Sequence, residues 1–194
     1  MNKNLEKLYN AIEKWSNFLL FDIEANFQEV DNIKEYETIQ IWFIKINSSF
    51  NILDKWSIYI KPTKHLVLSD FIKDLTWINQ DEVNCWITFK EWLNELLKYF
   101  DKNKDYLMSY WNYDMKQIYH DCSINNIDYP FFEWDQCKYT KHINIKNALA
   151  TKLKIKEKWM LWLLTKLWLN LEWKHHNWED DCFNILKIIK NVFN

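Results

Sequence analysis

Two acidic residues, Asp22 and Glu24, lie at the end of the apolar run Phe18-Leu-Leu-Phe-Asp-Ile-Glu-Ala25. Such a run predicts a central strand, and alternate residues of a strand point to the same side, so the two carboxylates would project together. Carboxylates held together in apolar surroundings repel each other, and a hard divalent cation such as Mg²⁺ relieves this by taking their oxygens as ligands. The pair therefore indicates a metal site. The alternative is a strand that simply ends, with both acids in solvent.

Two further acidic residues and a histidine stand at similar junctions. Asp114 follows the short apolar segment 105–110, where a strand would give way to a helix, a usual place for ligands in α/β folds. His176 and Asp181 lie at the start of the last expected helix, and a histidine can act as a general base because its pKa is near neutrality. Each has a plainer alternative: an acid favoured by the helix dipole, or an acid-rich, capped helix start.

Four carboxylates and one histidine, in this order, are the side chains that two-metal phosphodiester hydrolysis needs. One metal ion activates a water, and a second ion about 4 Å away stabilises the leaving oxygen. The histidine would accept the proton of the attacking water. Together the signals favour a metal-dependent nuclease over the separate local alternatives.

The same segments resemble the DEDDh 3′→5′ exonucleases of the ribonuclease H-like fold, and most closely the branch of the histone-mRNA and RNA-interference 3′ exonucleases. The resemblance covers about residues 17–190 and is carried by four stretches in the order of the family: Phe18–Ala25, Leu68–Gln80, Tyr110–Asp114 and His175–Ile185. Four residues separate His176 from Asp181, as in the family.

This resemblance implies a site, its metal ions and its substrate contacts. Two Mg²⁺ or Mn²⁺ ions would be bound by the four carboxylates, with the histidine as general base: Asp22, Glu24, Asp114, Asp181 and His176. Phe71 and Tyr113 stand where that branch stacks aromatic rings on the terminal base, an interaction worth about 1–3 kcal/mol per base. For both aromatic residues, packing in the core is the alternative.

The residues between these motifs predict the elements that must hold them. Apolar residues at helical spacing indicate helices at 1–15, 79–100, 112–124, 145–153, 159–167 and 177–192. Strands are expected at 17–25, 37–46, 55–61 and 105–110, and a weaker one near 136–140. We therefore expect an α/β fold: a ribonuclease H-like, mixed five-stranded sheet, with a three-stranded antiparallel meander plus parallel strands, flanked by helices. Residues 1–16 would form an N-terminal helical arm and residues 17–194 the exonuclease domain.

Composition narrows the class of protein. Hydrophobic residues make up 48% of the 194 residues, enough for a packed core, and the formal net charge is −2. A protein that grips long nucleic acid through bulk charge is usually basic, so this balance favours an enzyme that holds only a strand end. No run is apolar and uncharged over the roughly 18 residues of a membrane span, and the charged N-terminus does not look like a secretion signal, so we expect a cytoplasmic protein. The four scattered cysteines suggest neither a zinc site nor disulfides.

The chain has no glycine and thirteen tryptophans, whereas average usage predicts about 13 or 14 glycines. Six tryptophans stand where the family pattern has glycine: Trp42, Trp77, Trp111, Trp168, Trp173 and Trp178. Trp168 follows a predicted helix, where glycine often forms a left-handed cap, a conformation that costs other residues about 1–2 kcal/mol. We infer that a codon read here as tryptophan is read as glycine in the source organism, as some bacteria read the opal stop codon. Ordinary tryptophan codons at positions 77, 111 and 168 would refute this. The alternative is a degenerate protein that has lost its fold.

The substrate is less closely specified. The resemblance favours the 3′ end of single-stranded RNA, and single-stranded DNA stays open because contacts to the 2′-hydroxyl decide between them. The chain has no arginine, so phosphate contacts fall to lysines such as those at 152, 154, 156 and 158, although a solvated face is the simpler interpretation of that run. Two other functions remain open: a non-catalytic nucleic-acid-binding module on the same fold, and a proofreading subunit bound to a polymerase.

Overall fold

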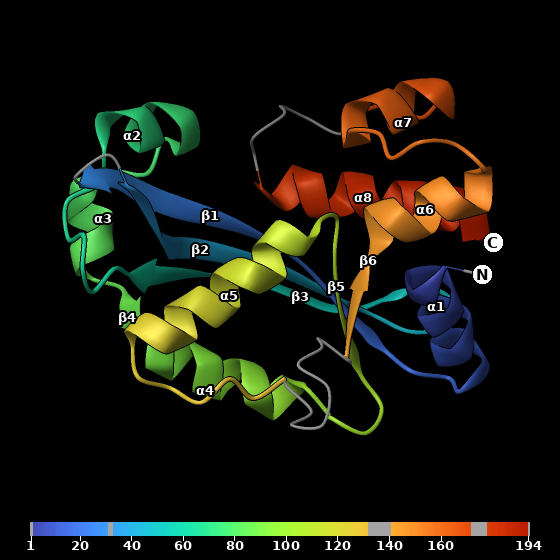
Figure 1. The fold of residues 1–194 in the computed structure, drawn as a ribbon, viewed down its shortest axis with the longest axis horizontal. Coiled ribbons are helices and arrows are strands. Elements are labelled where there is room, and N and C mark those ends of the chain that lie inside the picture. The colour runs from blue at the N-terminus through green and yellow to red at the C-terminus, as the bar shows by residue number, and fades with distance from the viewer. Residues whose placement is uncertain (1, 31–32, 132–140, 172–177, 194) are drawn as a thin grey trace.

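The computed structural model describes residues 2–30, 33–131, 141–171 and 178–193. Its centre is a mixed sheet in the order β4-β3-β2-β1-β5-β6, with helices on both sides (Figure 1). The strands are β1 (Phe18–Val30), β2 (Ile33–Ile46), β3 (Ile52–Lys61), β4 (Ile87–Thr88), β5 (Tyr106–Ser109) and β6 (His142–Asn144). The expected antiparallel meander is formed by β1, β2 and β3, while β5 and β6 run parallel to β1.

The described sheet has six strands, so the expectation of five was wrong. No strand was expected at β4 or at β6, and β4 pairs with the end of β3 through two residues only. A two-residue strand is too short to show an alternating pattern in the sequence. The weaker strand expected near residues 136–140 lies outside the described residues. The described chain resumes at residue 141, and β6 begins at His142.

The helices largely follow the predicted positions. They are α1 (Lys3–Glu13), α2 (Asp70–Thr76), α3 (Gln80–Asn84), α4 (Phe89–Tyr99), α5 (Asn112–Ile124), α6 (Ile145–Leu153), α7 (Met160–Lys166) and α8 (Trp178–Phe193). The single helix expected at 79–100 is instead two, because Asn79 and Thr88 each begin a helix with a capping box. The short helix α2 was not predicted.

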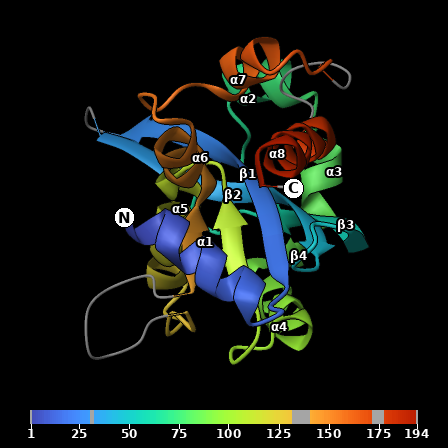
Figure 2. The same ribbon diagram turned by 90° about the vertical axis from the view of Figure 1, so that its right-hand side faces the viewer.

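The two faces of the sheet carry different helices, as Figures 1 and 2 show. Phe18 and Leu20 of β1 pack in a core cluster with α1, α6, α7 and α8. Leu19, Phe21 and Ile23 pack on the opposite face with α4 and α5. This alternation places Asp22 and Glu24 on the same side of the strand as Leu20, the side that α8 covers. A smaller cluster lies under α2 and α3.

The N-terminal helix α1 packs against the rest of the domain. Its Leu5, Leu8 and Ala11 are buried in the cluster that also contains α6 and α8, and Lys7 donates a hydrogen bond to the carbonyl of His142. The division of the chain at residue 16 stays a prediction. None of the helices in the described ranges is both long and apolar enough to cross a membrane.

Among the described residues, tryptophan occupies left-handed backbone at three positions, with φ of 55° at Trp15, 59° at Trp77 and 55° at Trp168. All three side chains are exposed. After α7, the N–H of Leu169 bonds to the carbonyl of Leu164 around Trp168, the pattern of a helix end that usually carries glycine. The structure therefore places Trp77 and Trp168 in the backbone conformation that glycine tolerates best.

The other tryptophans aligned with glycine are in different surroundings. Trp42 lies within β2 and is buried, and Trp111 precedes α5 with an extended backbone, so neither needs glycine for its dihedral angles. Trp173 lies outside the described residues, and Trp178 begins α8. Trp15, which the sequence pattern did not single out, has the same conformation as Trp168. The reassigned codon stays a prediction.

Candidate active site

Three separate elements bring four carboxylates to one region. Asp22 and Glu24 lie on β1, opposite Trp42 and Gln40 of β2, just before an irregularity in the pairing of the two strands. Asp114 is the third residue of α5, which begins directly after β5, the parallel neighbour of β1. Asp181 lies in the first turn of α8. The carboxylates therefore come from a strand and from the N-terminal turns of two helices.

The negative charges of this region act on Asp22 and Glu24. Burial, followed by the negative charges of Asp114, Glu24 and Asp181, holds the pKa of Asp22 well above its ordinary value. Burial, then Asp181 and Asp114, raises the pKa of Glu24 to about 8. The neighbouring carboxylates thus disfavour the charged forms of Asp22 and Glu24.

Burial also raises the pKa values of Asp114 and Cys182. Burial raises the pKa of Asp114 to about 7, against hydrogen bonds from Ser109 and from backbone groups that lower it. The thiol of Cys182, next to Asp181, has its pKa raised by burial and then by Asp22, Asp181 and Asp114. Cys182, Ile185 and Leu186 of the same helix are buried.

A divalent cation fits this site by charge and by donor chemistry. Within the described part of the chain, no lysine is among the groups that shift the pKa of Asp22, Glu24 or Asp114. Carboxylate oxygens are the ligands that hard cations prefer. Across residues 2–30, 33–131, 141–171 and 178–193, however, no three His, Cys, Asp or Glu side chains are arranged so that they would already hold an ion. The carboxylates are within electrostatic reach of one another, and an ion would have to draw their oxygens together.

The other sequence-predicted residues separate into two groups. His176 lies outside the described residues. Phe71 on α2 and Tyr113 on α5 are both at the surface, with exposed fractions of 59% and 37%. Both rings therefore pack against neighbours on one side and keep part of their surface open to solvent, and their contact with a terminal base stays a prediction.

A row of aromatic rings joins the two. Phe71 contacts the edge of Phe27 at a centroid distance of 5.7 Å, Phe27 lies 5.8 Å from Tyr36 across the β1–β2 pair, and Tyr36 lies 6.2 Å from Tyr113. The row Phe71-Phe27-Tyr36-Tyr113 thus runs from α2 over two strands to α5. Burial and then the neighbouring Tyr36 and Asp114 raise the pKa of the Tyr113 hydroxyl, so this ring stays neutral.

Several supporting residues were not found from the sequence. Asp121 of α5 is buried and accepts hydrogen bonds from Thr38 of β2 (2.5 Å), which ties α5 to β2, and from Gln117 of the same helix (3.2 Å). Ser109 is hydrogen-bonded to His142 at 2.9 Å, and burial followed by the charge of Lys7 lowers the pKa of His142 to about 3, so its ring is neutral. Thr38 and Asp121, like Ser109 and His142, lie far apart in the chain, and no local pattern connects them.

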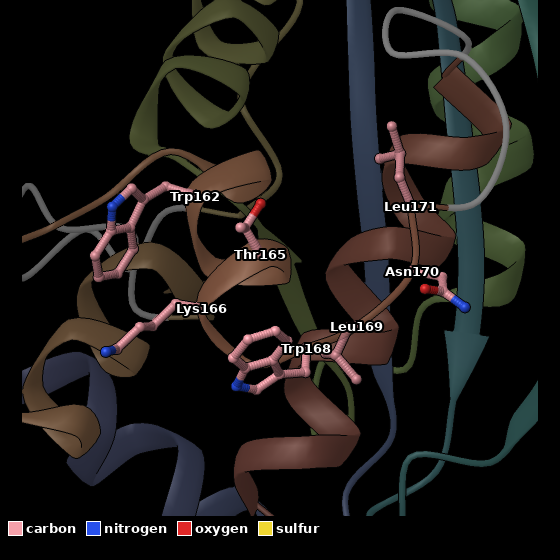
Figure 3. A pocket seen from close by; sticks show the side chains of 7 residues that line it. All are labelled: Trp162, Thr165, Lys166, Trp168, Leu169, Asn170 and Leu171. Atoms are coloured by element: carbon pink, nitrogen blue, oxygen red, sulfur yellow. The ribbon is translucent and has the colours of Figure 1, made fainter.

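Two hollows on the surface of the described residues differ in their relation to the candidate site residues. One, of about 570 Å³, is lined by seven residues between Trp162 and Leu171 on α7 and the segment after it (Figure 3). It contains none of the candidate residues. The other, of about 430 Å³, lies between the end of β1 and α2, and Phe27 of the aromatic row lines it.

Comparison with known proteins gives a consistent result. The model of the exonuclease family RNase T matches residues 19–189. The chain is 26% identical over 199 residues to 3′-5′ exoribonuclease 1 of Rattus norvegicus and 27% identical over 206 residues to the Homo sapiens protein. These matches cover 96% of this chain but only 56% and 57% of those proteins, so the chain spans about half the length of the curated relatives it matches.

The fold is also that of solved exonucleases. The nuclease domain of 3′hExo, a DEDDh family member bound to rAMP, superposes with a TM-score of 0.77 and 24% identity, covering 91% of this chain and 90% of that one. The expected ribonuclease H-like α/β fold is confirmed by this agreement.

Proposed function

Because the chain belongs to the exonuclease family whose model matches residues 19–189, we propose that it is a metal-dependent 3′→5′ exonuclease. It would release nucleoside monophosphates from the 3′ end of single-stranded RNA, with DNA as the second substrate to compare. The observation that carries the proposal is the convergence of four mutually repelling carboxylates from β1, α5 and α8.

Exonucleases of this kind generally use divalent metal ions, and two Mg²⁺ or Mn²⁺ ions are proposed here. Asp22, Glu24, Asp114 and Asp181 would hold them. When bound, the ions supply an activated water and stabilisation of the leaving oxygen. His176 would take the proton from the attacking water, because a neutral imidazole accepts a proton near neutral pH.

The aromatic row supports a single-stranded substrate. Phe71 and Tyr113 would stack on the bases next to the cleaved bond, since base–aromatic stacking tolerates any sequence. A duplex end would have to be unpaired before its bases could reach separate rings. The exposed faces of both side chains and their link through Phe27 and Tyr36 favour this arrangement.

RNA is proposed ahead of DNA because of the proteins that this chain resembles. The curated relatives are exoribonucleases, and the similar solved domain was bound to a ribonucleotide, rAMP. The absence of arginine from the sequence leaves phosphate contacts to lysines, which act as point charges and do not read the sugar. The choice between the two sugars therefore rests on contacts to the 2′-hydroxyl.

The test is a shortening assay on single-stranded RNA and on DNA of the same sequence, each labelled at the 5′ end. We expect a ladder that shortens from the 3′ end in Mg²⁺ or Mn²⁺, that is absent in EDTA and absent for Asp22→Asn, with RNA degraded faster. A folded protein that binds RNA but shortens neither strand would instead identify a non-catalytic binding module.

A further inference from the structure

The segment that leads from β3 to α2 is held mainly by side chains from other elements. The buried carboxylate of Glu37 on β2 accepts hydrogen bonds from the backbone N–H groups of Thr63, Lys64 and His65 at 2.8, 3.0 and 2.6 Å. Residues 63–65 therefore follow a path set by a side chain rather than by strand pairing.

Asn26 of β1 holds the rest of this segment. Its side-chain amide donates to the carbonyls of His65 (3.2 Å) and Val67 (3.1 Å), and its oxygen accepts from the N–H of Ser69 (3.0 Å). Asn26 is completely buried, so water cannot replace these bonds. Gln80 makes two more hydrogen bonds to this segment. Its side-chain amide donates to the carbonyl of Leu66, and its side-chain oxygen accepts from the N–H of Leu68.

The position of Asn26 connects two parts of the proposed site. It lies two residues beyond Glu24 on the same strand. Ser69, which it binds, is the N-cap of α2 and accepts from the N–H of Ile72, and Phe71 is the second residue of that helix. The side chain of Asn26 is thus a short bridge between the strand with the carboxylates and the helix with the exposed aromatic ring.

We propose that Asn26 is a positioning residue for the exonuclease reaction. It fixes α2, and with it Phe71, at a set distance from the carboxylates on β1, so that the terminal base stacks while its phosphate lies at the carboxylates. This role rests on the proposed function, because it uses Phe71 as a contact to the terminal base. Asparagine suits the position since it offers two donors and an acceptor on one short side chain.

The experiment measures kcat and KM with two RNA substrates that differ only in the 3′-terminal nucleotide. One carries a normal base and the other an abasic ribose, which has nothing to stack on Phe71. Asn26→Ala removes all three bonds, and the isosteric Asn26→Asp keeps the acceptor for Ser69 but loses the amide donors. We expect both variants to raise KM on the normal substrate, by about tenfold for Asn26→Ala, with kcat changed by less than about twofold.

On the abasic substrate the variants and the unaltered protein should have the same KM. The Phe71→Ala variant and the double variant Phe71→Ala with Asn26→Ala should likewise have the same KM on the normal substrate, because neither has a ring at position 71 to stack. Gln28→Ala, which removes a single exposed bond to the carbonyl of Val67, is the matched control and should leave both constants unchanged. Asn47→Ala, which removes two backbone contacts in the β2–β3 turn, controls for a general loss of stability.

The outcomes separate the possible failures. An equal rise in KM on both substrates, a fall in kcat alone, or no change in either constant would overturn the positioning role. The positioning role would also be overturned if the Asn26 variants and Asn47→Ala lost activity in the same proportion to their loss in melting temperature. A residue that only stabilises the fold would give that result. An unaltered protein that shortens neither RNA would overturn the proposed function itself.

Discussion

Replacing Glu24 with glutamine separates what the carboxylate cluster does for catalysis from what it costs the fold. Glu24→Gln keeps the size of the side chain and removes its charge. The pKa of Glu24 is raised to about 8 from an ordinary 4.5 by burial and then by Asp181 and Asp114. In the absence of a divalent ion, the folded protein therefore holds a proton that the unfolded chain has released at neutral pH.

The direction of the effect follows from the raised pKa. Because the folded state binds the proton more tightly, stability is highest below the unfolded pKa and is lost as the pH rises toward the folded pKa. For these two pKa values the loss is about 1 kcal/mol at pH 5 and about 4 kcal/mol at pH 8. Glutamine has no such dependence, and a buried amide that finds no partner costs about 1–2 kcal/mol at either pH. The variant should then be about 2 kcal/mol more stable at pH 8 and no more stable at pH 5.

The assay is urea unfolding in EDTA at both pH values, with Glu13→Gln on the exposed face of α1 as the control. In Mg²⁺ the order should reverse, since the ion stabilises the folded form of the unaltered protein more than that of the variant. RNA shortening by the variant should fall at least about a hundredfold. Parallel dependence of stability on pH in the two proteins would refute the conclusion that Glu24 is forced against other carboxylates.

Three further outcomes are expected. His176→Ala should abolish RNA shortening while leaving the melting temperature within about 2 °C of the unaltered protein; full activity would exclude it as the general base. Tyr113→Ala should raise KM for single-stranded RNA about tenfold, measured with the same labelled strands, and an unchanged KM would remove this ring from the substrate surface. Trp77→Gly and Trp168→Gly should each stabilise the fold by about 1–2 kcal/mol in urea unfolding, whereas Trp92→Gly, at a buried position in α4, should destabilise it. Destabilisation by all three would contradict the inference that glycine belongs at positions 77 and 168.

Local patterns were sufficient where an element is long or ends at a clear signal. The bounds of α5 and α6 are those expected, because apolar spacing and the preceding strands define both helices. The four candidate carboxylates could be predicted from the sequence for a related reason. Each lies at the end of an apolar strand or at the start of a helix, where an acidic residue stands out from its neighbours. The helix α2 was not, because its seven residues are too few to show a period.

Residues that act through distant partners could not be predicted. Asn26 holds backbone groups 39 to 43 positions away, and Ser109 meets His142 across 33 positions. The sequence around Asn26 and around Ser109 gives no sign of these contacts. They form only when the chain has folded and β1, β5 and β6 lie side by side. For the same reason, the sequence could place Phe71 and Tyr113 on a family motif but could not show that Phe27 and Tyr36 join them.

The segment from residue 63 to residue 69 is specified from outside itself. Glu37, Asn26 and Gln80 bind its backbone N–H and carbonyl groups, which every amino acid except proline provides in full. The exposed side chains of Leu66 and Val67 can therefore change while the course of the segment, and the helix that follows, stay where they are. Val67 is exposed and lines the hollow between the end of β1 and α2, so a substitution there would change the charge or the shape of that hollow. This makes the segment a natural place to alter which strands the protein accepts without rebuilding the carboxylates beneath it.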